Sequence, residues 1–180
     1  HPLYGSLHQK IITIDDNLAF VGGMDLTIRR WDTCDHAESN PHRIAPDGSS
    51  YPPVHDVQMA VDGEAAVCID ATARERWRIA TGEEIAGANT EAHTWPSDLA
   101  PDLIDVPVAV ARTVPDWGGT LPVKEIGTLT EDILASAKHA IYIEAQYFTA
   151  SNVRRLLVKS RLAGSAPPGW EFVEAERRVW

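Results

Sequence analysis

The 180-residue chain carries a formal net charge of −10, and 44% of its residues are hydrophobic. A chain of this size can bury one sizeable core, so we expect a folded domain. The negative charge argues against a general nucleic-acid-binding surface, which needs clustered Lys and Arg, but it leaves room for a local basic pocket. Two cysteines make no disulfide framework. No apolar run reaches the roughly 18 residues of a membrane span, which predicts a soluble or peripheral membrane protein of unknown compartment.

Residues 8–21 predict two strands joined by a tight turn. Residues 10–14 are mostly β-branched and apolar, and residues 18–21 form a second apolar run. The Asp-Asp-Asn sequence at 15–17 consists of turn formers. Gly22 and Gly23 follow, and they let the backbone turn sharply and approach a ligand closely.

The middle of the chain predicts a long loop, a strand and a helix. Residues 33–54 are polar and contain four prolines, and a loop of this length is often functional. Residues 57–61 predict a strand. Asp62 suits the N-cap of a helix that runs to about Thr81, and Gly82 suits its stop. Apolar residues at helical spacing are expected to face the core: Ala66, Ile69, Ala73, Trp77 and Ala80.

The rest of the chain alternates between strand and helix patterns. Residues 82–107 predict a surface loop or linker, residues 108–111 an apolar strand, and residues 113–119 a turn. An amphipathic helix is expected around Ile126, Leu129, Ile133 and Ala137. A buried strand at 140–145 and a helix at 152–162 would follow. This alternation predicts an α/β fold, a layered mixed sheet with flanking helices.

His8 and Lys10 are the residues whose placement suggests chemistry. On a strand they project from the same face, so one phosphate could meet both. Asp15 has the opposite parity and can join them only if the strand ends and turns there. A His-x-Lys pair alone is usually an accidental surface pair, and only together with the residues around it does it indicate a site.

His8, Lys10 and Asp15 form the pattern His-x-Lys-x-x-x-x-Asp, which resembles the signature of the phospholipase D superfamily. The likeness continues, in the order seen in the larger, eukaryote-like phospholipases D, through four segments: Gly22-Gly23-Met24-Asp25-Leu26, Arg30-Trp31-Asp32-Thr33, His55-Asp56-Val57 and residues 141–148. Asp25 and Ala145 depart from the family, in which Asn is common at both positions.

The resemblance implies a role for each motif residue. His8 would be the nucleophile that forms a phosphohistidine, and Lys10 would hold a phosphate oxygen. Asp25 would contact the phosphate and, if ionised, would be expected to bind Lys10; its alternative is a turn or cap residue. Asp56 is favoured as the carboxylate that orients His8. Asp15, although part of the catalytic motif, is given a structural role near the turn.

Three further residues are candidates for substrate binding by the same resemblance: Gly22, Gly23 and Trp31. A Trp in this position is more often a core or loop anchor than a headgroup contact. No metal or other cofactor is expected, because a His–Lys pair supplies both nucleophile and charge.

The family is built of two repeated halves that each give one motif to a shared site. No other histidine of this chain has Lys two residues later. We therefore expect a fragment, in which residues 1–120 are the end of the first half and residues 121–180 the start of the second, without its motif. A missing second half, or a second protomer, would complete the site.

The expected function is hydrolysis or transphosphatidylation of phospholipid at a membrane surface, with this fragment inactive alone. A non-catalytic half-site module is the alternative from another class. A cardiolipin-synthase-like or nuclease-like phosphodiesterase is a further alternative within the same superfamily.

Overall fold

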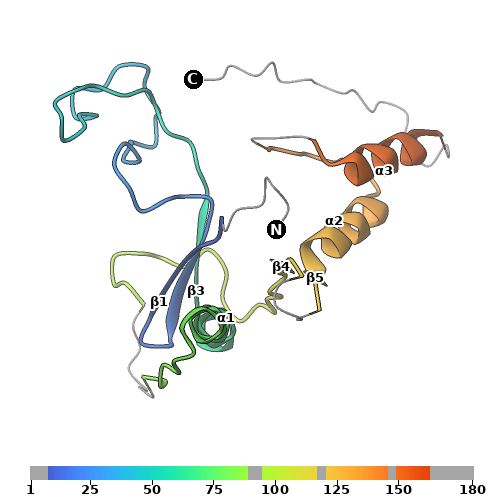
Figure 1. The fold of residues 1–180 in the computed structure, drawn as a ribbon. Helices are drawn as coiled ribbons and strands as arrows, with labels where there is room; N and C mark the ends of the chain where they lie inside the picture. The colour runs from blue at the N-terminus through green and yellow to red at the C-terminus, as the bar shows by residue number, and fades with distance from the viewer. Residues whose placement is uncertain (1–7, 89–94, 117–120, 146–148, 163–180) are drawn as a thin grey trace. The chain divides into compact units, whose positions relative to one another are not determined.

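The structure is a computed structural model that describes residues 8–88, 95–116, 121–145 and 149–162. The chain divides into two compact units, one up to Val110 and one from Ala111 onward. The described elements are three helices and two small antiparallel sheets, a mixture compatible with the predicted α/β class (Figure 1). Among the described helices, none has the length and apolar character needed to span a bilayer.

The first unit is built on a three-stranded antiparallel sheet. Its strands are β1 (Lys10–Ile14), β2 (Leu18–Gly22) and β3 (Gln58–Asp62), and they lie in the order β1-β2-β3. Lys10 faces Gly22 across the first pair, and Gly22 faces Gln58 across the second. The predicted strands at 10–14, 18–21 and 57–61 are confirmed, with β2 and β3 each ending one residue later.

The hairpin between β1 and β2 turns through the predicted acidic residues. Asp15 and Asp16 have φ values of 52° and 59°, and the N–H of Asn17 donates to the carbonyl oxygen of Ile14 at 3.1 Å. Positive φ at two successive residues is typical of a type I′ turn, and Asp and Asn tolerate it better than other side chains. The turn residues therefore fix the register that places Lys10 beside the end of β2.

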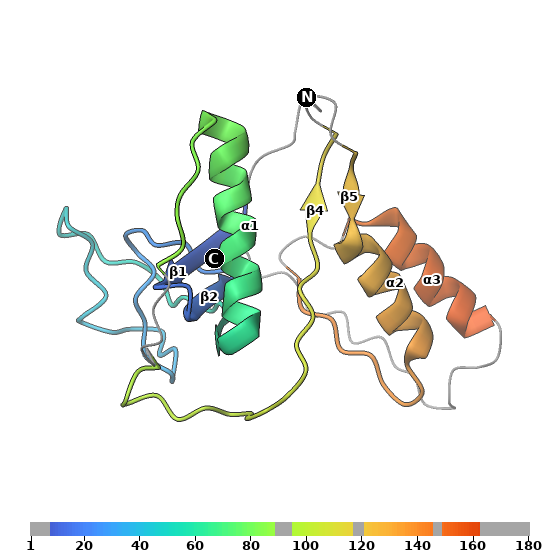
Figure 2. The same ribbon diagram turned by 90° about the horizontal axis from the view of Figure 1, so that it is seen from below.

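Helix α1 (Gly63–Thr81) covers one face of this sheet, as Figure 2 shows for β1 and β2. Ala19 of β2 packs in the core against Ala66 and Ile69 of the helix. Gly82 closes the helix with φ 77° and donates its N–H to the carbonyl oxygen of Arg78 at 2.8 Å. The predicted bounds of the helix are confirmed, although the side chain of Asp62 makes no capping hydrogen bond.

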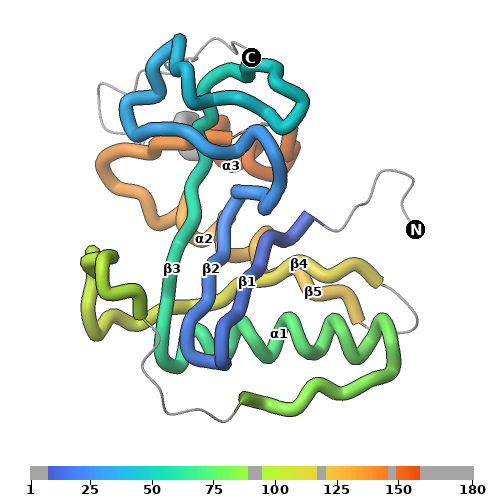
Figure 3. The backbone as a smooth tube through the Cα atoms, turned by 90° about the vertical axis from the view of Figure 1, so that its left-hand side faces the viewer, coloured from blue at the N-terminus to red at the C-terminus, as the bar shows by residue number. Residues whose placement is uncertain are grey.

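The predicted core face of α1 is correct only in its first half. Ala66 and Ile69 are buried, whereas Trp77 is 45% exposed and Ala80 is also exposed. Figure 3 shows the reason, because α1 runs across the strands and not along them. Three strands span only about 10 Å between their outer axes, and a helix of this length extends about 28 Å. The last turns of α1 therefore lie outside the sheet.

Arg74 ties the hairpin turn to α1 and to the segment that follows it. Its guanidinium binds the carboxylates of Asp16 and Asp70, and it donates to the carbonyl oxygen of Ile85 at 2.8 Å. Asp16 also accepts the N–H of Ala88 at 2.6 Å. The turn next to Asp15 is thus held by a charged network that the spacing of the sequence did not predict.

The second unit holds a two-stranded sheet and two helices. The strands β4 (Thr113–Val114) and β5 (Val123–Lys124) pair antiparallel, and α2 (Glu125–Ser136) contacts α3 (Ser151–Leu162). Glu125 at the start of α2 accepts two hydrogen bonds from the Arg112 guanidinium, both at 3.1 Å. The two predicted helices are confirmed.

Two strands predicted after residue 107 are wrong. Residues 108–111 form no strand, and β4 begins at Thr113, inside the predicted turn. Residues 140–145 also form no strand, and Tyr142 is 86% exposed. A short apolar run becomes a strand only when a neighbouring strand pairs with its N–H and C=O groups, and the described residues pair none with these two runs.

Three of the apolar residues whose spacing predicts α2 are exposed in the structure. Ile126, Leu129 and Ile133 are between 42% and 58% exposed, and Leu134 is the buried residue of the helix. The apolar spacing was interpreted correctly as helical, but the spacing does not identify which side another element covers.

Candidate active site

The candidate site lies at the beginning of β1, where His8 and Lys10 stand two residues apart. Lys10 is the first residue of the strand, and its side chain is only 11% exposed, whereas His8 is exposed. The Lys10 ammonium donates to the carbonyl oxygen of His8 at 3.2 Å. The cation is therefore held close to the backbone that carries the proposed nucleophile.

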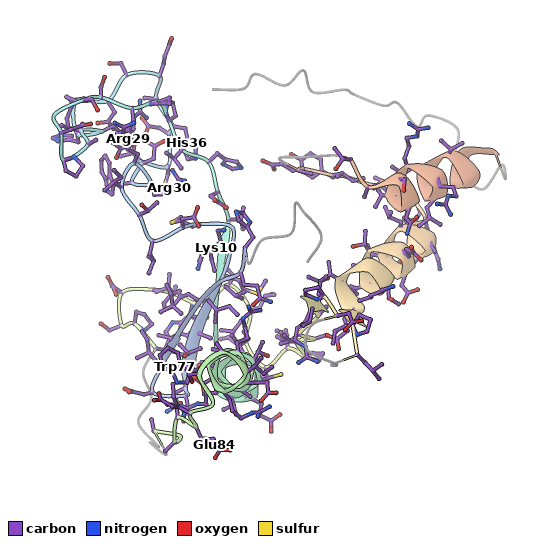
Figure 4. The ribbon with its side chains drawn as sticks, viewed as in Figure 1. Lys10, Arg29, Arg30, His36, Trp77 and Glu84 are labelled. Atoms are coloured by element: carbon purple, nitrogen blue, oxygen red, sulfur yellow. The ribbon has the colours of Figure 1, made fainter. Side chains whose placement is uncertain are left out.

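Asp25 joins two cations at this end of the sheet. Its Oδ1 lies 3.0 Å from Nζ of Lys10, and its Oδ2 lies 3.5 Å from an Nη of Arg30. The hydrogen bond from Lys10 lowers the pKa of Asp25 below its usual value. The expected contact between Asp25 and Lys10 is confirmed. Figure 4 shows Lys10 at the end of the sheet and Arg30 in the loop beyond it.

Gly22 and Gly23 are explained by close packing against the segment before β3. The N–H of Gly23 donates to the carbonyl oxygen of Val57 at 3.0 Å. A Cβ on Gly23 would lie 2.2 Å from Oδ1 of Asp56, and a Cβ on Gly22 would lie 2.2 Å from the Val57 carbonyl oxygen. Both glycines therefore allow residues 56–58 to approach β2, and their contact with substrate stays a prediction.

Asp56 is brought next to Gly23, but not into a hydrogen bond with the ring of His8. Its Oδ1 accepts the N–H of Val57 at 2.8 Å. Within the described part of the chain, the hydrogen bonds of Asp56 include none to His8. The orienting role of Asp56 stays a prediction.

Asp15 is separated from His8 by the whole length of β1. The strand is extended over Lys10–Ile14, so the seven residue steps from His8 to Asp15 correspond to roughly 20 Å. The positive φ of Asp15 places it in the hairpin turn. This geometry favours the structural role for Asp15 over a direct catalytic one.

Sequence comparison finds several similar proteins, although no family model matches the chain. Phospholipase D1 of Saccharomyces cerevisiae is 30% identical over 193 aligned residues, which cover 81% of this chain. Phospholipase D A and phospholipase D C of Dictyostelium discoideum are 28% and 31% identical over 184 and 100 residues, covering 84% and 42% of the chain. The chain is related to the phospholipases D. It spans only 11%, 14% and 6% of the length of these three relatives.

In this chain, the loop between β2 and β3 is organised around the carboxylate of Asp32. Its Oδ1 accepts the N–H of Thr33 and an Nη of Arg43, both at 2.8 Å. Its Oδ2 accepts the N–H of Val54 at 2.8 Å and lies 3.1 Å from Nδ1 of His36. Asp32 thereby connects the start of the loop to the residues that lead into Asp56.

Arg43 is the largest fully buried side chain among the described residues. Besides Asp32, it donates to the carbonyl oxygens of Ala37 and Glu38, the latter at 2.8 Å. Sequence reasoning missed this residue, because a lone Arg in a polar, proline-containing loop gives no sign of burial. Its pairing with Asp32, eleven positions earlier, has no periodic signal either.

Trp31 lies on the same loop and is 51% exposed. Its carbonyl oxygen accepts the hydroxyl of Tyr51 at 3.0 Å, and its ring meets the ring of His42 edge-on with centroids 6.4 Å apart. These contacts agree with the interpretation of Trp31 as a loop anchor, while substrate binding by its ring stays a prediction. None of the predicted site residues falls in the described part of the second unit, and residues 146–148 of the fourth resembling segment lie outside the described residues.

Proposed function

We propose that this chain supplies one half of a phospholipase D-like site that hydrolyses or transfers phospholipid phosphodiester bonds. The observation that carries the proposal is the pair of cations, Lys10 and Arg30, that hold one acidic group, with Lys10 also bound to the carbonyl oxygen of His8. A phosphodiester needs a nucleophile and positive charge at its non-bridging oxygens, and this cluster offers both. Kinship with proteins named phospholipase D supports the choice of phospholipid.

In the proposed reaction, a ring nitrogen of His8 attacks phosphorus. A P–N bond forms and the P–O bond to the headgroup breaks, so the departing alkoxide must receive a proton. Lys10 stabilises the negative charge that develops on the phosphate oxygens. Water or an alcohol then attacks phosphorus, loses its proton to a base, and releases His8. Hydrolysis and transphosphatidylation differ only in this last step, in which water or an alcohol, respectively, takes the phosphatidyl group from His8.

The acid that protonates the headgroup oxygen is assigned to a second histidine outside this sequence. No other histidine of the chain has Lys two residues later. The proposal therefore includes a second half or a second protomer that completes a layered, two-half architecture. In that assembly residues 1–120 belong to the first half and residues 121–180 begin the second.

The proposed orienting carboxylate is Asp56, whose side chain packs closely against Gly23. A nucleophilic imidazole needs one ring nitrogen unprotonated, and a carboxylate that accepts the other N–H fixes this tautomer. No metal or cofactor takes part in the proposed chemistry, because Lys10 supplies the charge that a metal would bring.

Three other functions are less well supported. The net charge of −10 disfavours a nuclease-like activity, because a nucleic-acid surface needs clustered cations. A cardiolipin-synthase-like reaction uses the same cluster and differs in its acceptor. A non-catalytic half-site module would keep the fold and bind phosphate without turnover.

The test is formation of phosphatidic acid from phosphatidylcholine vesicles, followed by mass spectrometry. The chain is assayed alone and together with a polypeptide that supplies a second His-x-Lys motif. Activity is expected in the mixture or in a dimer of the chain but not in the monomer, and His8→Ala should abolish it with an unchanged circular dichroism spectrum. His139→Ala, which changes an exposed histidine, is the matched control. Full turnover in the His8 variant contradicts the proposal, and turnover by the monomeric chain, with its state verified by light scattering, contradicts the half-site.

A further inference from the structure

The carboxylate of Asp25 occupies the position between two cations where a phosphate group would be expected to bind. We infer that Arg30 is a second phosphate-binding residue and that Asp25 is a resident anion which the phosphate displaces. This inference rests on the proposed function, which places a phosphate beside Lys10. It adds Arg30, which is not part of the motif, and a competition between Asp25 and phosphate for the same two cations.

The two oxygen atoms of Asp25 are held separately. Oδ1 meets Nζ of Lys10 at 3.0 Å, and Oδ2 faces the guanidinium of Arg30 at 3.5 Å. A phosphodiester also presents two equivalent anionic oxygens on one centre, so it can use the same two donors. Arg is well suited to this contact because its planar guanidinium offers several N–H groups.

Burial of the three side chains allows the exchange. Lys10 is 11% exposed and Arg30 is 39% exposed, while Asp25 is the most exposed of the three at 43%. Arg30 is further held by a hydrogen bond to the carbonyl oxygen of Arg29 at 3.2 Å. A ligand arriving from solvent can therefore replace the carboxylate while both cations keep their places.

Asp25 has to be ionised at neutral pH for this competition to exist. The Lys10 hydrogen bond and the nearby charges of Lys10 and Arg30 lower the pKa of its carboxyl, against the opposing effect of burial. The carboxylate therefore neutralises part of the site in the free protein. Removing its charge should strengthen the binding of any phosphate that uses the same donors.

Arg29 gives a matched comparison for Arg30. It is the adjacent residue with the same charge, yet its guanidinium binds Asp47 at 3.1 Å and the hydroxyl of Ser49 at 2.9 Å. Both of its partners lie in another part of the loop. Loss of charge at Arg29 therefore tests whether any nearby arginine affects phosphate binding, while loss at Arg30 tests the specific contact.

The experiment is calorimetric titration of the chain with inorganic phosphate at low ionic strength. Asp25→Asn is expected to tighten the dissociation constant about tenfold, since one competing ionic contact is removed. Arg30→Gln should weaken it about tenfold in either background, and Arg30→Lys should restore part of the loss. Arg29→Gln should change it by less than about twofold. Circular dichroism verifies the fold of each variant, and Asp25→Ser replaces Asp25→Asn if the latter unfolds.

The outcomes separate this inference from the proposed function. If Lys10→Gln weakens binding but Arg30→Gln does not, the phosphate site stands and the role of Arg30 is overturned. If neither Asp25 variant binds phosphate more tightly than the unchanged chain, the displacement is overturned. If Lys10→Gln also leaves the affinity unchanged, the cluster is no phosphate site, and the proposed function fails with it.

Discussion

The buried guanidinium of Arg43 donates to the carboxylate of Asp32 at 2.8 Å, and this ion pair holds the long loop between β2 and β3 together. The side chains are 1% and 5% exposed, so water cannot replace either partner. The same carboxylate accepts the N–H of Val54, two residues before Asp56. Asp32 and Arg43 therefore hold the segment that leads into Asp56.

Arg43→Ala should destabilise the protein strongly. It leaves Asp32 buried without its cation and two carbonyl oxygens without their donor, and breaking a buried pair in this way costs about 3–5 kcal/mol. Urea unfolding measures the loss. Arg29→Ala, which removes an ion pair whose side chains are 45% and 63% exposed, should cost no more than about 1 kcal/mol. Equal losses of unfolding free energy in the two variants would show that the buried Arg43 pair stabilises the protein no more than the exposed Arg29 pair.

Low pH should reduce the free energy of unfolding through protonation of Asp32. Burial raises the pKa of this carboxyl, but hydrogen bonds from His36, Val54, Arg43 and Thr33 outweigh it and leave the pKa well below its usual range. The folded chain then binds fewer protons at Asp32 than the unfolded chain, so stability from this group is complete above about pH 4–5 and is lost as the pH falls toward the folded pKa.

The measurement for this acid dependence is the free energy of unfolding between pH 6 and about pH 3. Asp32→Asn should be less stable at pH 6, and its stability should fall less steeply with acid. If the slope of the variant matches that of the unchanged chain, other carboxyl groups cause the acid sensitivity.

Gly23→Ala should disturb the site through Asp56. The added Cβ would lie 2.2 Å from Oδ1 of Asp56, so the aspartate has to move, at a cost of about 1–3 kcal/mol. All three nearest atoms belong to that side chain, so the second change Asp56→Ala should recover most of the loss in thermal unfolding. Gly127→Ala in α2 meets no atom within 4 Å and should be neutral or stabilising. Failure of the double variant to recover would place the clash in the backbone.

Replacement by Asn should affect turnover differently at Asp56 and at Asp15. In the assembled enzyme, Asp56→Asn should lower turnover by roughly 10³–10⁴-fold with little change in stability, by analogy with the carboxylate of the serine-protease triad. Asp15→Asn should leave turnover near normal, because Asn also tolerates the positive φ of 52° at that turn. Initial rates on phosphatidylcholine vesicles decide between them, and a reversed pattern would make Asp15 the orienting residue.

Removal of metal ions should leave the assembled enzyme active. The proposed chemistry uses the charge of Lys10 where a metal-dependent phosphodiesterase uses Mg²⁺ or Zn²⁺. Phosphatidic acid formation should persist in EDTA, measured with a soluble short-chain substrate to remove any effect of calcium on vesicles. Complete loss that zinc restores would contradict the mechanism.

The elements that the sequence predicted well have local causes. The hairpin depends on acidic turn residues such as Asp15, and α1 depends on its own spacing and on Gly82. The elements that it predicted wrongly depend on distant partners. The apolar runs at 108–111 and 140–145 needed neighbouring strands, and no spacing within a run identifies one.

The candidate site residues also fall into those that local spacing indicates and those that depend on distant partners. His8 and Lys10 were identified because a strand places residues two apart on one face. Arg30 could not be assigned to the site, because four residues of irregular loop separate it from Asp25, and only the three-dimensional path of that loop brings them together. The dependence of the loop on Arg43 was invisible for the same reason.

The ties of Arg74 have a consequence for the motions of the molecule. One guanidinium holds the hairpin turn through Asp16, its own helix through Asp70, and the following segment through Ile85. Opening any one of these parts requires the release of the same side chain. The amide hydrogens of Asn17 and Ala88, which lie far apart in the chain, should therefore exchange with deuterium at related rates, as members of one cooperative opening unit.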